Sequence, residues 1–205
     1  MRVELRSWAL MGLAGIVWVT LLITGAVTGN GDAFGAISAT VPVLLVLGYL
    51  FERWGWRIGR IPRLFGVPLV RGTWKGTLSP LGPGASVKVA YLAVQQTLTS
   101  ASVRLLTDES ESDQIAGTVF HRTSGAPAIS YTYFNTPVID RREASPIHHG
   151  GGLLTILGRN QLRLEGEYWT ERATKGKLVF TEHAATVARS YADAAALFAD
   201  SAPAY

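Results

Sequence analysis

Two long stretches near the amino terminus carry no charged residue, and they restrict the possible folds more than any other feature of this chain. No Asp, Glu, Lys or Arg occurs between Arg6 and Asp32, where the run 10–29 (LMGLAGIVWVTLLITGAVTG) is apolar. A second uncharged run, 33–51 (AFGAISATVPVLLVLGYLF), follows directly after a short turn. About 20 apolar residues are enough for a helix to cross a bilayer, where backbone amides must bond within helices or closed barrels. The two runs therefore predict a transmembrane helical hairpin.

Arginines flank both runs and predict how the hairpin is oriented. Arg2 and Arg6 precede the first run and four arginines follow the second, whereas the turn between them carries only Asp32. Lys and Arg close to membrane spans favour the cytoplasmic side, so both termini are expected in the cytoplasm. The alternative for the first run is a cleavable signal peptide with Arg2 and Arg6 as its basic region. The run is long for a signal peptide, and cleavage would leave a span flanked by strong positive charge.

The composition excludes several classes of function. The chain has 205 residues, of which 48% are hydrophobic and 17% charged, and it has no cysteine. Disulfides, thiol nucleophiles and cysteine metal sites are therefore excluded. Of the net charge of +4, residues 1–63 carry +3 and residues 64–205 carry +1. A near-neutral body with a basic amino-terminal part is not typical of a protein that binds DNA.

Beyond residue 63, continuous apolar runs give way to alternating apolar and polar residues, interrupted by Gly, Pro, Ser and Asp. Alternation with period two indicates half-buried strands. The candidate strands are 72–79, 87–100, 102–107, 114–123, 128–136, 152–157, 161–172 and 177–182. Eight strands with short links predict an antiparallel sheet closed into a small barrel. The expected fold class is a membrane-anchored all-β protein, with a hairpin over 1–63, a cytoplasmic barrel over 64–183 and a C-terminal helix and tail over 184–205.

The carboxy-terminal segment has the spacing of an amphipathic helix. Val187, Tyr191, Ala194, Ala195 and Phe198 recur at helical intervals and share one face. This face is expected to pack on the barrel or to cover one of its ends.

The clearest alternation lies in 161–172, where most residues of one parity are charged. Successive strand residues point to opposite faces, so the other parity is expected to face the barrel interior. This inward set begins apolar and ends polar, and it includes Leu162, Leu164, Gly166, Tyr168, Thr170 and Arg172. An eight-stranded barrel has room inside for side chains or for one small ligand.

An inward arginine needs an anionic partner, because an unpaired buried charge is costly. No acid shares the face of Arg172 on its strand. Two interpretations remain open: Arg172 binds an anionic ligand, or it lies at the barrel rim, solvated or paired with an acid such as Asp108 or Asp113.

A second alternating stretch, 129–135, has Tyr131, Tyr133 and Asn135 on one face. Stacking rings beside a fixed amide are the elements of a nucleobase pocket. The same residues are ordinary strand residues, so a structural role is the alternative.

Motifs of common enzymes are missing from the sequence. It contains no nucleophile elbow, phosphate loop or zincin motif. No carboxylate lies at ligand spacing from the histidines, and Glu165, Glu167 and Glu171 are expected to face solvent. The sequence therefore predicts no catalytic residue, no metal and no cofactor.

A set of short motifs follows the hairpin and its basic linker in a fixed order. They are Gly72-Thr73-Trp74-x-Gly76, Val94-x-Gln96-Thr97, Thr107-x-x-Ser110-x-Ser112, Tyr131-x-Tyr133-x-Asn135-x-Pro137, a His-Gly segment, and Gly166-x-Tyr168-x-Thr170-x-Arg172-x-x-x-Gly176. This order resembles the CD-NTase-associated two-transmembrane, β-strand-rich effector family of CBASS, a bacterial antiphage defence system. The resemblance spans about residues 8–182, and the helix after residue 183 lies outside it. The tract 148–152 admits more than one register for the His-Gly segment, so neither of its histidines is assigned a role.

The resemblance implies a receptor and not an enzyme. In such a family an infection-activated CD-NTase makes a cyclic oligonucleotide, here expected to be a cyclic dinucleotide. The barrel binds it, and the hairpins assemble into homo-oligomers that breach the bacterial inner membrane and kill the cell. Matching positions would contact the ligand: Tyr168, Thr170 and Arg172, the last on a phosphate; Tyr133 and Asn135 on a base; and Gln96, Ser110 and Ser112 as further polar contacts.

Two rival functions remain open beside the receptor. In one, the barrel carries a lipid or another apolar ligand next to the membrane. This would suit Leu162, Leu164 and Tyr168 but not the end with Thr170 and Arg172. In the other, the chain is a structural membrane protein whose barrel binds another protein.

Overall fold

The computed structural model describes residues 15, 18–19, 33–82, 84–158 and 161–199. The chain divides into two compact units, residues 1–67 and residues 68–205. Most of the predicted first span, 10–29, lies outside the described residues.

The described part of the first unit is helical. It contains α2 (Ala33–Arg53), with Pro42 inside it, the short 3₁₀ turn η1 (Gly55–Arg57) and the single-turn helix α3 (Ile61–Leu64). The rings of Phe51 and Phe65 pack against each other, with their centroids 6.1 Å apart. Within the described part of the chain, no helix combines the length and the apolarity that crossing a bilayer requires. The helix α2 confirms the helix expected over 33–51. The structure does not confirm that this helix crosses a membrane.

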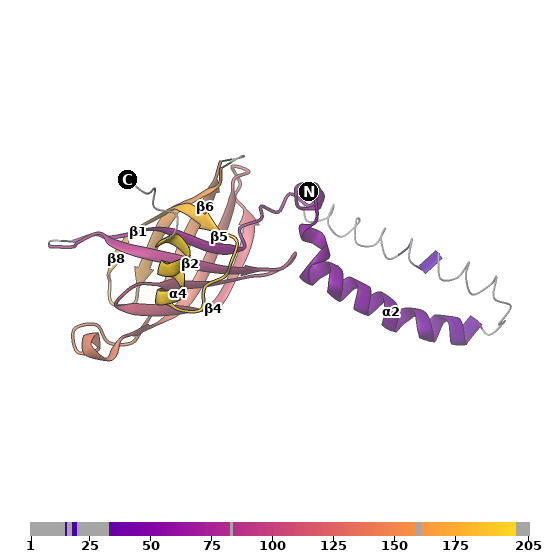
Figure 1. Ribbon diagram of the computed structural model, residues 1–205, viewed down its shortest axis with the longest axis horizontal. Helices are drawn as coiled ribbons and strands as arrows, with labels where there is room; N and C mark the ends of the chain where they lie inside the picture. The colour runs from indigo at the N-terminus through magenta and orange to yellow at the C-terminus, as the bar shows by residue number, and fades with distance from the viewer. Residues whose placement is uncertain (1–14, 16–17, 20–32, 83, 159–160, 200–205) are drawn as a thin grey trace. The chain divides into compact units, whose positions relative to one another are not determined.

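The second unit is an eight-stranded antiparallel barrel in which every strand pairs with its sequence neighbour and β1 pairs with β8 (Figure 1). The strands are β1 (Gly72–Pro80), β2 (Lys88–Gln96), β3 (Ala101–Leu106), β4 (Ser110–His121), β5 (Pro127–Pro137), β6 (His148–Leu157), β7 (Arg163–Thr170) and β8 (Lys175–Ala184). The short 3₁₀ turn η2 (Ile139–Arg141) lies between β5 and β6. The predicted antiparallel barrel is confirmed, and each strand overlaps its predicted range.

Strand ends differ from the prediction where local hydrogen bonds close a turn. β2 ends at Gln96 instead of residue 100, because the Thr97 amide bonds the Ser100 carbonyl at 2.9 Å. β6 begins at His148 instead of residue 152. The prediction missed this start because the three glycines at 150–152 have no side chains whose polarity could alternate. β7 ends at Thr170, where the amide of Ala173 bonds the Thr170 carbonyl at 3.1 Å.

The barrel interior is an apolar cluster at one end and polar at the other. In β7, Leu164 is completely buried and Tyr168 and Thr170 nearly so, whereas Trp169 is exposed. The predicted inward and outward parity of this strand is confirmed over these residues. The apolar cluster continues through the inward residues of the other strands and through Val70, which precedes β1.

The C-terminal segment covers part of the outer wall. The helix α4 (Tyr191–Ala199) packs through Ala194 and Phe198 against Tyr91, Ala93 and Leu106 of β2 and β3, and Figure 1 shows it lying across the outside of the barrel. The predicted C-terminal helix is confirmed, and it covers a wall rather than an end. Val187 precedes the helix but packs against the same cluster.

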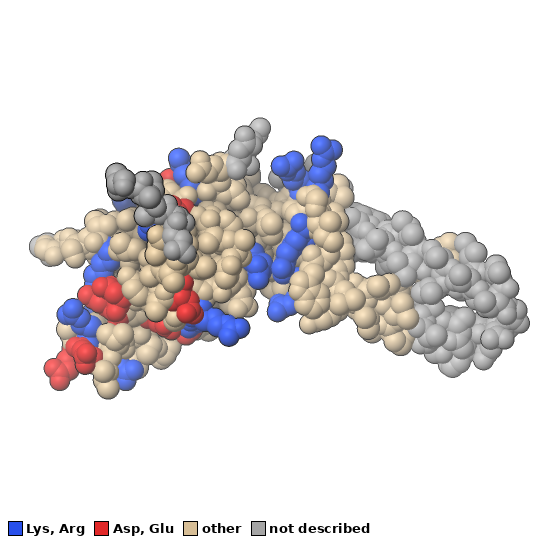
Figure 2. Space-filling view, in the orientation of Figure 1, with Lys and Arg blue, Asp and Glu red and all other residues tan. Residues whose placement is uncertain are grey.

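Elsewhere the outer surface is charged and mixed in sign. On the face seen in Figure 2, basic side chains of the barrel lie beside acidic ones. Pairs such as Lys75 with Glu182 and Arg163 with Glu165 account for part of this pattern. Exposed pairs of this kind contribute about 0–1 kcal/mol each, so the stability of the barrel comes mainly from its interior.

Three interior tyrosines each lie against a glycine of the neighbouring strand. The register pairs are Tyr131 with Gly152, Tyr133 with Gly150, and Tyr168 with Gly176. A methyl group added at any of these glycines would come within 2.5 Å or 2.6 Å of the paired ring. The glycines therefore let the rings lie flat along the wall and keep them out of the centre of the barrel.

We expect Gly150→Ala to destabilise the barrel by about 1–3 kcal/mol, the usual effect of overpacking a closely packed interior. The added methyl would meet the Tyr133 ring and the Trp169 carbonyl, both at 2.5 Å. Urea unfolding followed by circular dichroism measures the change. Gly151→Ala is the matched control, because its methyl points outward and the three atoms nearest to it all belong to the exposed Trp169 side chain. Equal destabilisation by both variants would contradict the proposed fit.

Candidate ligand-binding site

A pocket of about 160 Å³ opens at the end of the barrel where β1, β3, β5 and β7 finish and the even-numbered strands begin. Antiparallel order brings these strand ends together, although they are distant in sequence. The lining is mainly polar and includes Lys88, Glu109, Ser110, Ser112, Tyr133, Asn135, Ser145, His148, Tyr168, Thr170, Arg172 and Thr174. The polar end expected from the β7 sequence is therefore a real cavity.

The pocket brings together all the predicted contact residues except Gln96. The structure places Gln96 at the end of β2, which is the opposite end of the barrel. There its Oε1 accepts a bond from the Val70 amide at 2.8 Å, and its Nε2 donates to the Pro68 carbonyl at 2.9 Å. Gln96 thus fastens the segment before β1 across the apolar end and does not line the pocket.

Tyrosine and threonine hydroxyls form one wall of the pocket. Burial raises the pKa of Tyr133 and of Tyr168 above its ordinary value, and in Tyr133 the neighbouring Tyr168 adds to the effect. Both phenols therefore stay neutral and can donate a hydrogen bond. Thr170 and Thr174 share a bond of 2.7 Å between their hydroxyls across the β7–β8 turn.

Ser112 and Asn135 form a fixed polar pair on neighbouring strands. The Ser112 hydroxyl donates to Asn135 Oδ1 at 2.7 Å, and both residues are buried. This bond sets the orientation of the amide group, because its oxygen is already used. Within the described residues Nδ2 of Asn135 makes no hydrogen bond. The Nδ2 group of Asn135 is thus a hydrogen-bond donor in a fixed orientation at the pocket wall, as the nucleobase interpretation of this strand requires.

Arg172 lies at the rim of the pocket and not inside the barrel. It follows β7, in a turn where Ala173 has a φ of 59°, so the strand alternation that predicted an inward side chain stops before it. Its Nη1 donates to Ser145 Oγ at 2.8 Å and lies 3.4 Å from Nδ1 of His148. Among the described residues no carboxylate is within ion-pair distance of Arg172, so the pairing with Asp108 or Asp113 does not form. The prediction of an inward position is wrong, but the guanidinium still lines the pocket.

The described histidines and carboxylates do not form a metal site, since no three of them lie close enough to hold an ion. His148 turns its Nδ1 to the Pro146 carbonyl at 2.8 Å. His149 faces outward and lies 3.4 Å from Glu171.

A family model described as "Cap15, cyclic dinucleotide receptor domain" matches residues 65–182, which is more than half of the chain. The chain belongs to this family. The match begins before β1 and ends within β8, so it contains the whole lining of the pocket. A curated relative, CD-NTase-associated protein 15 of Staphylococcus schleiferi, is 28% identical over 142 residues, which cover 69% of this chain and 74% of the relative. The predicted resemblance to a CBASS effector family is confirmed.

The pocket of this Cap15 receptor domain contains a second cation that sequence reasoning missed. Lys88 forms an ion pair with Glu109 at the rim, and Arg141 lies 3.7 Å from the same carboxylate. The hydrogen bond from Lys88 is the largest influence that holds the pKa of Glu109 below its ordinary value. Lys88 shares the parity of the inward residues Ala90 and Leu92 and begins its strand at the polar end. Parity combined with strand order would have identified it.

We expect the contribution of Glu109 to stability to disappear in acid. Its pKa is lower in the folded chain than the ordinary value of 4.5. A depressed pKa adds stability above pH 4.5 that is lost as the pH falls through the folded value. The melting temperatures of the wild type and Glu109→Gln should therefore differ most near pH 6 and converge towards pH 3.

Lys88→Gln provides the control for this pH dependence. Without Lys88 the carboxylate keeps only the more distant Arg141, so Glu109→Gln should have a smaller effect at pH 6 in that background. A difference between wild type and Glu109→Gln that grows in acid would contradict the assignment.

Proposed function

We propose that this protein is an antiphage effector whose barrel binds a cyclic dinucleotide at the polar end and responds by disrupting the inner membrane. The observation that carries the proposal is the position of Arg172. Its guanidinium stands over a pocket of buried tyrosines and a fixed amide, with no carboxylate paired to it among the described residues. A planar guanidinium binds phosphate by paired, charge-assisted bonds. The family to which the chain belongs is described as a cyclic dinucleotide receptor.

The walls of the pocket suit the rest of such a ligand. The rings of Tyr133 and Tyr168 offer apolar faces for a base, and Nδ2 of Asn135 offers a donor for a base edge. Ser110, Ser112 and Thr170 supply further hydroxyls. We propose that the ligand is made by a CD-NTase, the class of enzyme with which the relative from Staphylococcus schleiferi is associated by name.

The pocket is small for a complete dinucleotide. Its volume of about 160 Å³ lies below the roughly 300–1,000 Å³ of typical small-molecule sites. We propose that one nucleotide enters the barrel and the other extends over the rim, against the segment 138–147 that carries Ser145. Binding would then draw this segment onto the ligand. This movement of the segment 138–147 would change the surface of the barrel when the ligand binds.

The interior of the barrel supports a lipid carrier less well than it supports a nucleotide receptor. An acyl chain needs an apolar hollow, but the apolar end is occupied by packed side chains such as Leu154, Leu164 and Phe180. The space that remains is lined by hydroxyls, an amide and charges. Desolvating these groups against hydrocarbon without hydrogen bonds would be unfavourable.

We expect Arg172→Ala to weaken binding of the cognate cyclic dinucleotide by about tenfold to a hundredfold, the effect of losing charge-assisted hydrogen bonds to a phosphate. Arg172→Lys keeps the charge but not the paired geometry, so its loss should be smaller. Calorimetric titration of the full chain measures both.

Arg163→Ala is the matched control for Arg172→Ala, because Arg163 lies outward on the same hairpin and its one ion pair with a described residue is to Glu165. Unchanged affinity in Arg172→Ala, or an equal loss in Arg163→Ala, would refute the receptor site. Strong binding of a co-purified fatty acid in place of nucleotide would favour the lipid carrier.

We further propose that ligand binding promotes assembly of the chain into homo-oligomers in the bacterial inner membrane, with both termini cytoplasmic. The two uncharged runs, 10–29 and 33–51, and their arginine flanks support this proposal. A ligand shifts such an equilibrium only if it binds the assembled state more tightly than the dispersed one. The ligand must therefore contact groups that assembly rearranges, and the rim segment 138–147 is the element we propose for that role.

Liposomes that contain the full chain should release a trapped dye only after the cyclic dinucleotide is added. Chemical crosslinking of the same liposomes should shift the chain to larger species over the same ligand concentrations. Arg172→Ala should require a higher ligand concentration for both effects, and Arg163→Ala should behave as the wild type does. Leakage without ligand, or leakage with no change in crosslinked species, would refute the coupled mechanism.

A further inference from the structure

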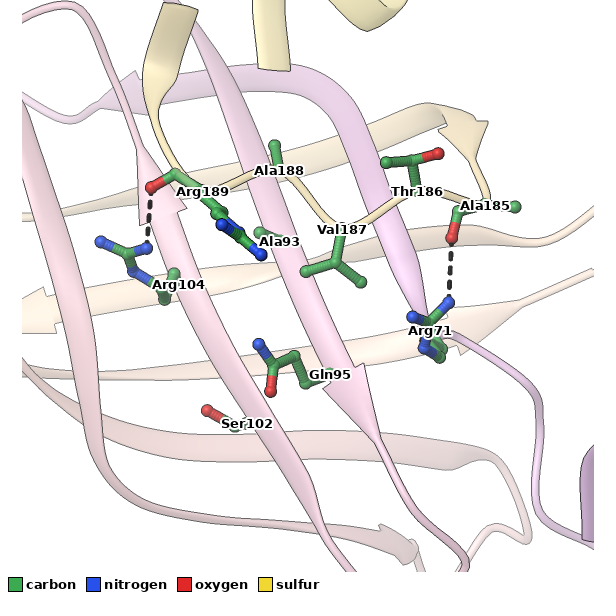
Figure 3. Close-up of a pocket in the computed structure, with 10 residues that line it drawn as sticks. All are labelled: Arg71, Ala93, Gln95, Ser102, Arg104, Ala185, Thr186, Val187, Ala188 and Arg189. Carbon is green, nitrogen blue, oxygen red and sulfur yellow. Dashed lines mark hydrogen bonds between the residues drawn. The ribbon is translucent and has the colours of Figure 1, made fainter. Parts of the chain in front are cut away.

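We propose that a second groove, on the outer wall of the barrel, binds the phosphate group of a small anionic ligand. The groove has a volume of about 490 Å³ and lies between β2, β3 and the segment 185–189 that connects β8 to α4 (Figure 3). It is separate from the barrel-end pocket, with which it shares no lining residue. Its volume falls within the range of small-molecule sites.

Three arginines from three different parts of the chain line the groove. They are Arg71 before β1, Arg104 on β3, and Arg189 before α4, and the lining contains no Asp or Glu. Arg104 is already neutralised from outside the groove by Glu111 at 2.9 Å and Asp113 at 2.7 Å. The other two arginines of the lining, Arg71 and Arg189, are not neutralised in this way.

Arg71 and Arg189 have no carboxylate within ion-pair distance in the described parts of the chain. Arg71 donates to the Ala185 carbonyl at 3.1 Å, a neutral partner that orients the guanidinium without cancelling its charge. Figure 3 shows the side chain of Arg189 extending towards the middle of the groove, and no hydrogen bond joins that side chain to any described residue. Two like charges that face one cavity are each stabilised by an anion between them.

The rest of the groove supports binding of a phosphate rather than simple solvation. The register pairs Ala93 with Arg104 and Gln95 with Ser102 form the floor, so an amide and a hydroxyl lie on the same wall as the arginines. Arg104 donates to the Arg189 carbonyl at 2.8 Å, which ties the segment 185–189 to β3. The Thr73 hydroxyl fixes the same segment, since it donates to the Thr186 carbonyl at 2.7 Å and accepts from the Ala188 amide at 2.8 Å. The backbone that carries Arg189 is therefore held in place before any ligand arrives.

Inorganic pyrophosphate is the probe that tests the groove, used with the full chain in neutral detergent at low salt. The Arg172→Ala background removes the guanidinium of the barrel-end pocket and leaves there only Lys88, which is paired with Glu109, so that binding at that pocket is weakened. We expect calorimetric titration to detect pyrophosphate binding, and Arg189→Gln to weaken it by about tenfold or more. Higher salt should weaken binding in the parent and affect Arg189→Gln less.

Arg163→Gln is the matched control, because it removes an equal charge from another part of the barrel surface. The side chain of Arg189 makes no hydrogen bond to any described residue, and its backbone carbonyl stays in place in the variant, so its replacement should leave the melting temperature unchanged. The inference is overturned if pyrophosphate does not bind, if Arg189→Gln binds as the parent does, or if Arg163→Gln weakens binding equally. In the chain with native Arg172, Arg189→Gln should leave cyclic dinucleotide affinity unchanged, so failure of this inference and failure of the proposed function are distinguishable.

Two sources supply the phosphate chemistry, and short-chain lipids separate them. Dihexanoyl phosphatidylglycerol should compete with pyrophosphate if the natural ligand is a lipid headgroup, whereas dihexanoyl phosphatidylcholine should not. Binding of pyrophosphate without competition by either lipid supports a soluble phosphate as the ligand. Competition that persists in Arg189→Gln would show that the lipid acts elsewhere and would overturn the lipid source.

Discussion

The narrow interior of an eight-stranded barrel is the constraint on which this structure depends. Such a barrel has room for one set of inward side chains and little else. Where these are leucine, valine and phenylalanine they fill the space, as Leu164, Leu178 and Phe180 do. A ligand therefore finds space only where the inward residues are small or lie flat along the wall. The chain meets that condition at one end, where hydroxyls, an amide and flat-lying tyrosines replace aliphatic groups. Gly150 and Gly176, which lie opposite Tyr133 and Tyr168, keep that end open.

The sequence identified the barrel because alternation survives in most strands, and it failed where alternation disappears. The three glycines at 150–152 hid the first half of β6, although two of them, Gly150 and Gly152, give Tyr133 and Tyr131 their positions. Arg172 follows the last strand residue, so extending the alternation to it gave an inward position that the β7–β8 turn prevents. Its part in the pocket comes from the turn and from Ser145, which is distant in sequence.

Gln96 and Lys88 show what a further step of sequence reasoning would have added. Both have the inward parity of β2, but they stand at its two ends. In an up-and-down barrel the starts of even-numbered strands lie beside the ends of odd-numbered strands. Lys88 must therefore share an end with Thr170, and Gln96 must lie at the other end. Motif order alone does not contain this distinction, because it ignores the direction in which each strand runs.

Arg172 and Lys88, the two cations at the rim, differ in the free energy that a ligand must expend to bind them. Arg172 is paired with no carboxylate in the described part of the chain, so a phosphate can bind its guanidinium without displacing an acid. Lys88 must leave Glu109, but that pair is about one-third exposed on both sides, and partly exposed pairs of this kind contribute about 0–1 kcal/mol. Two charge-assisted bonds to phosphate exceed that amount. A ligand with two phosphates can thus hold Arg172 with one and recruit Lys88 with the other. The freed Glu109 would keep Arg141, which belongs to the same rim segment as Ser145. Ligand binding and rearrangement of that segment would then be one event.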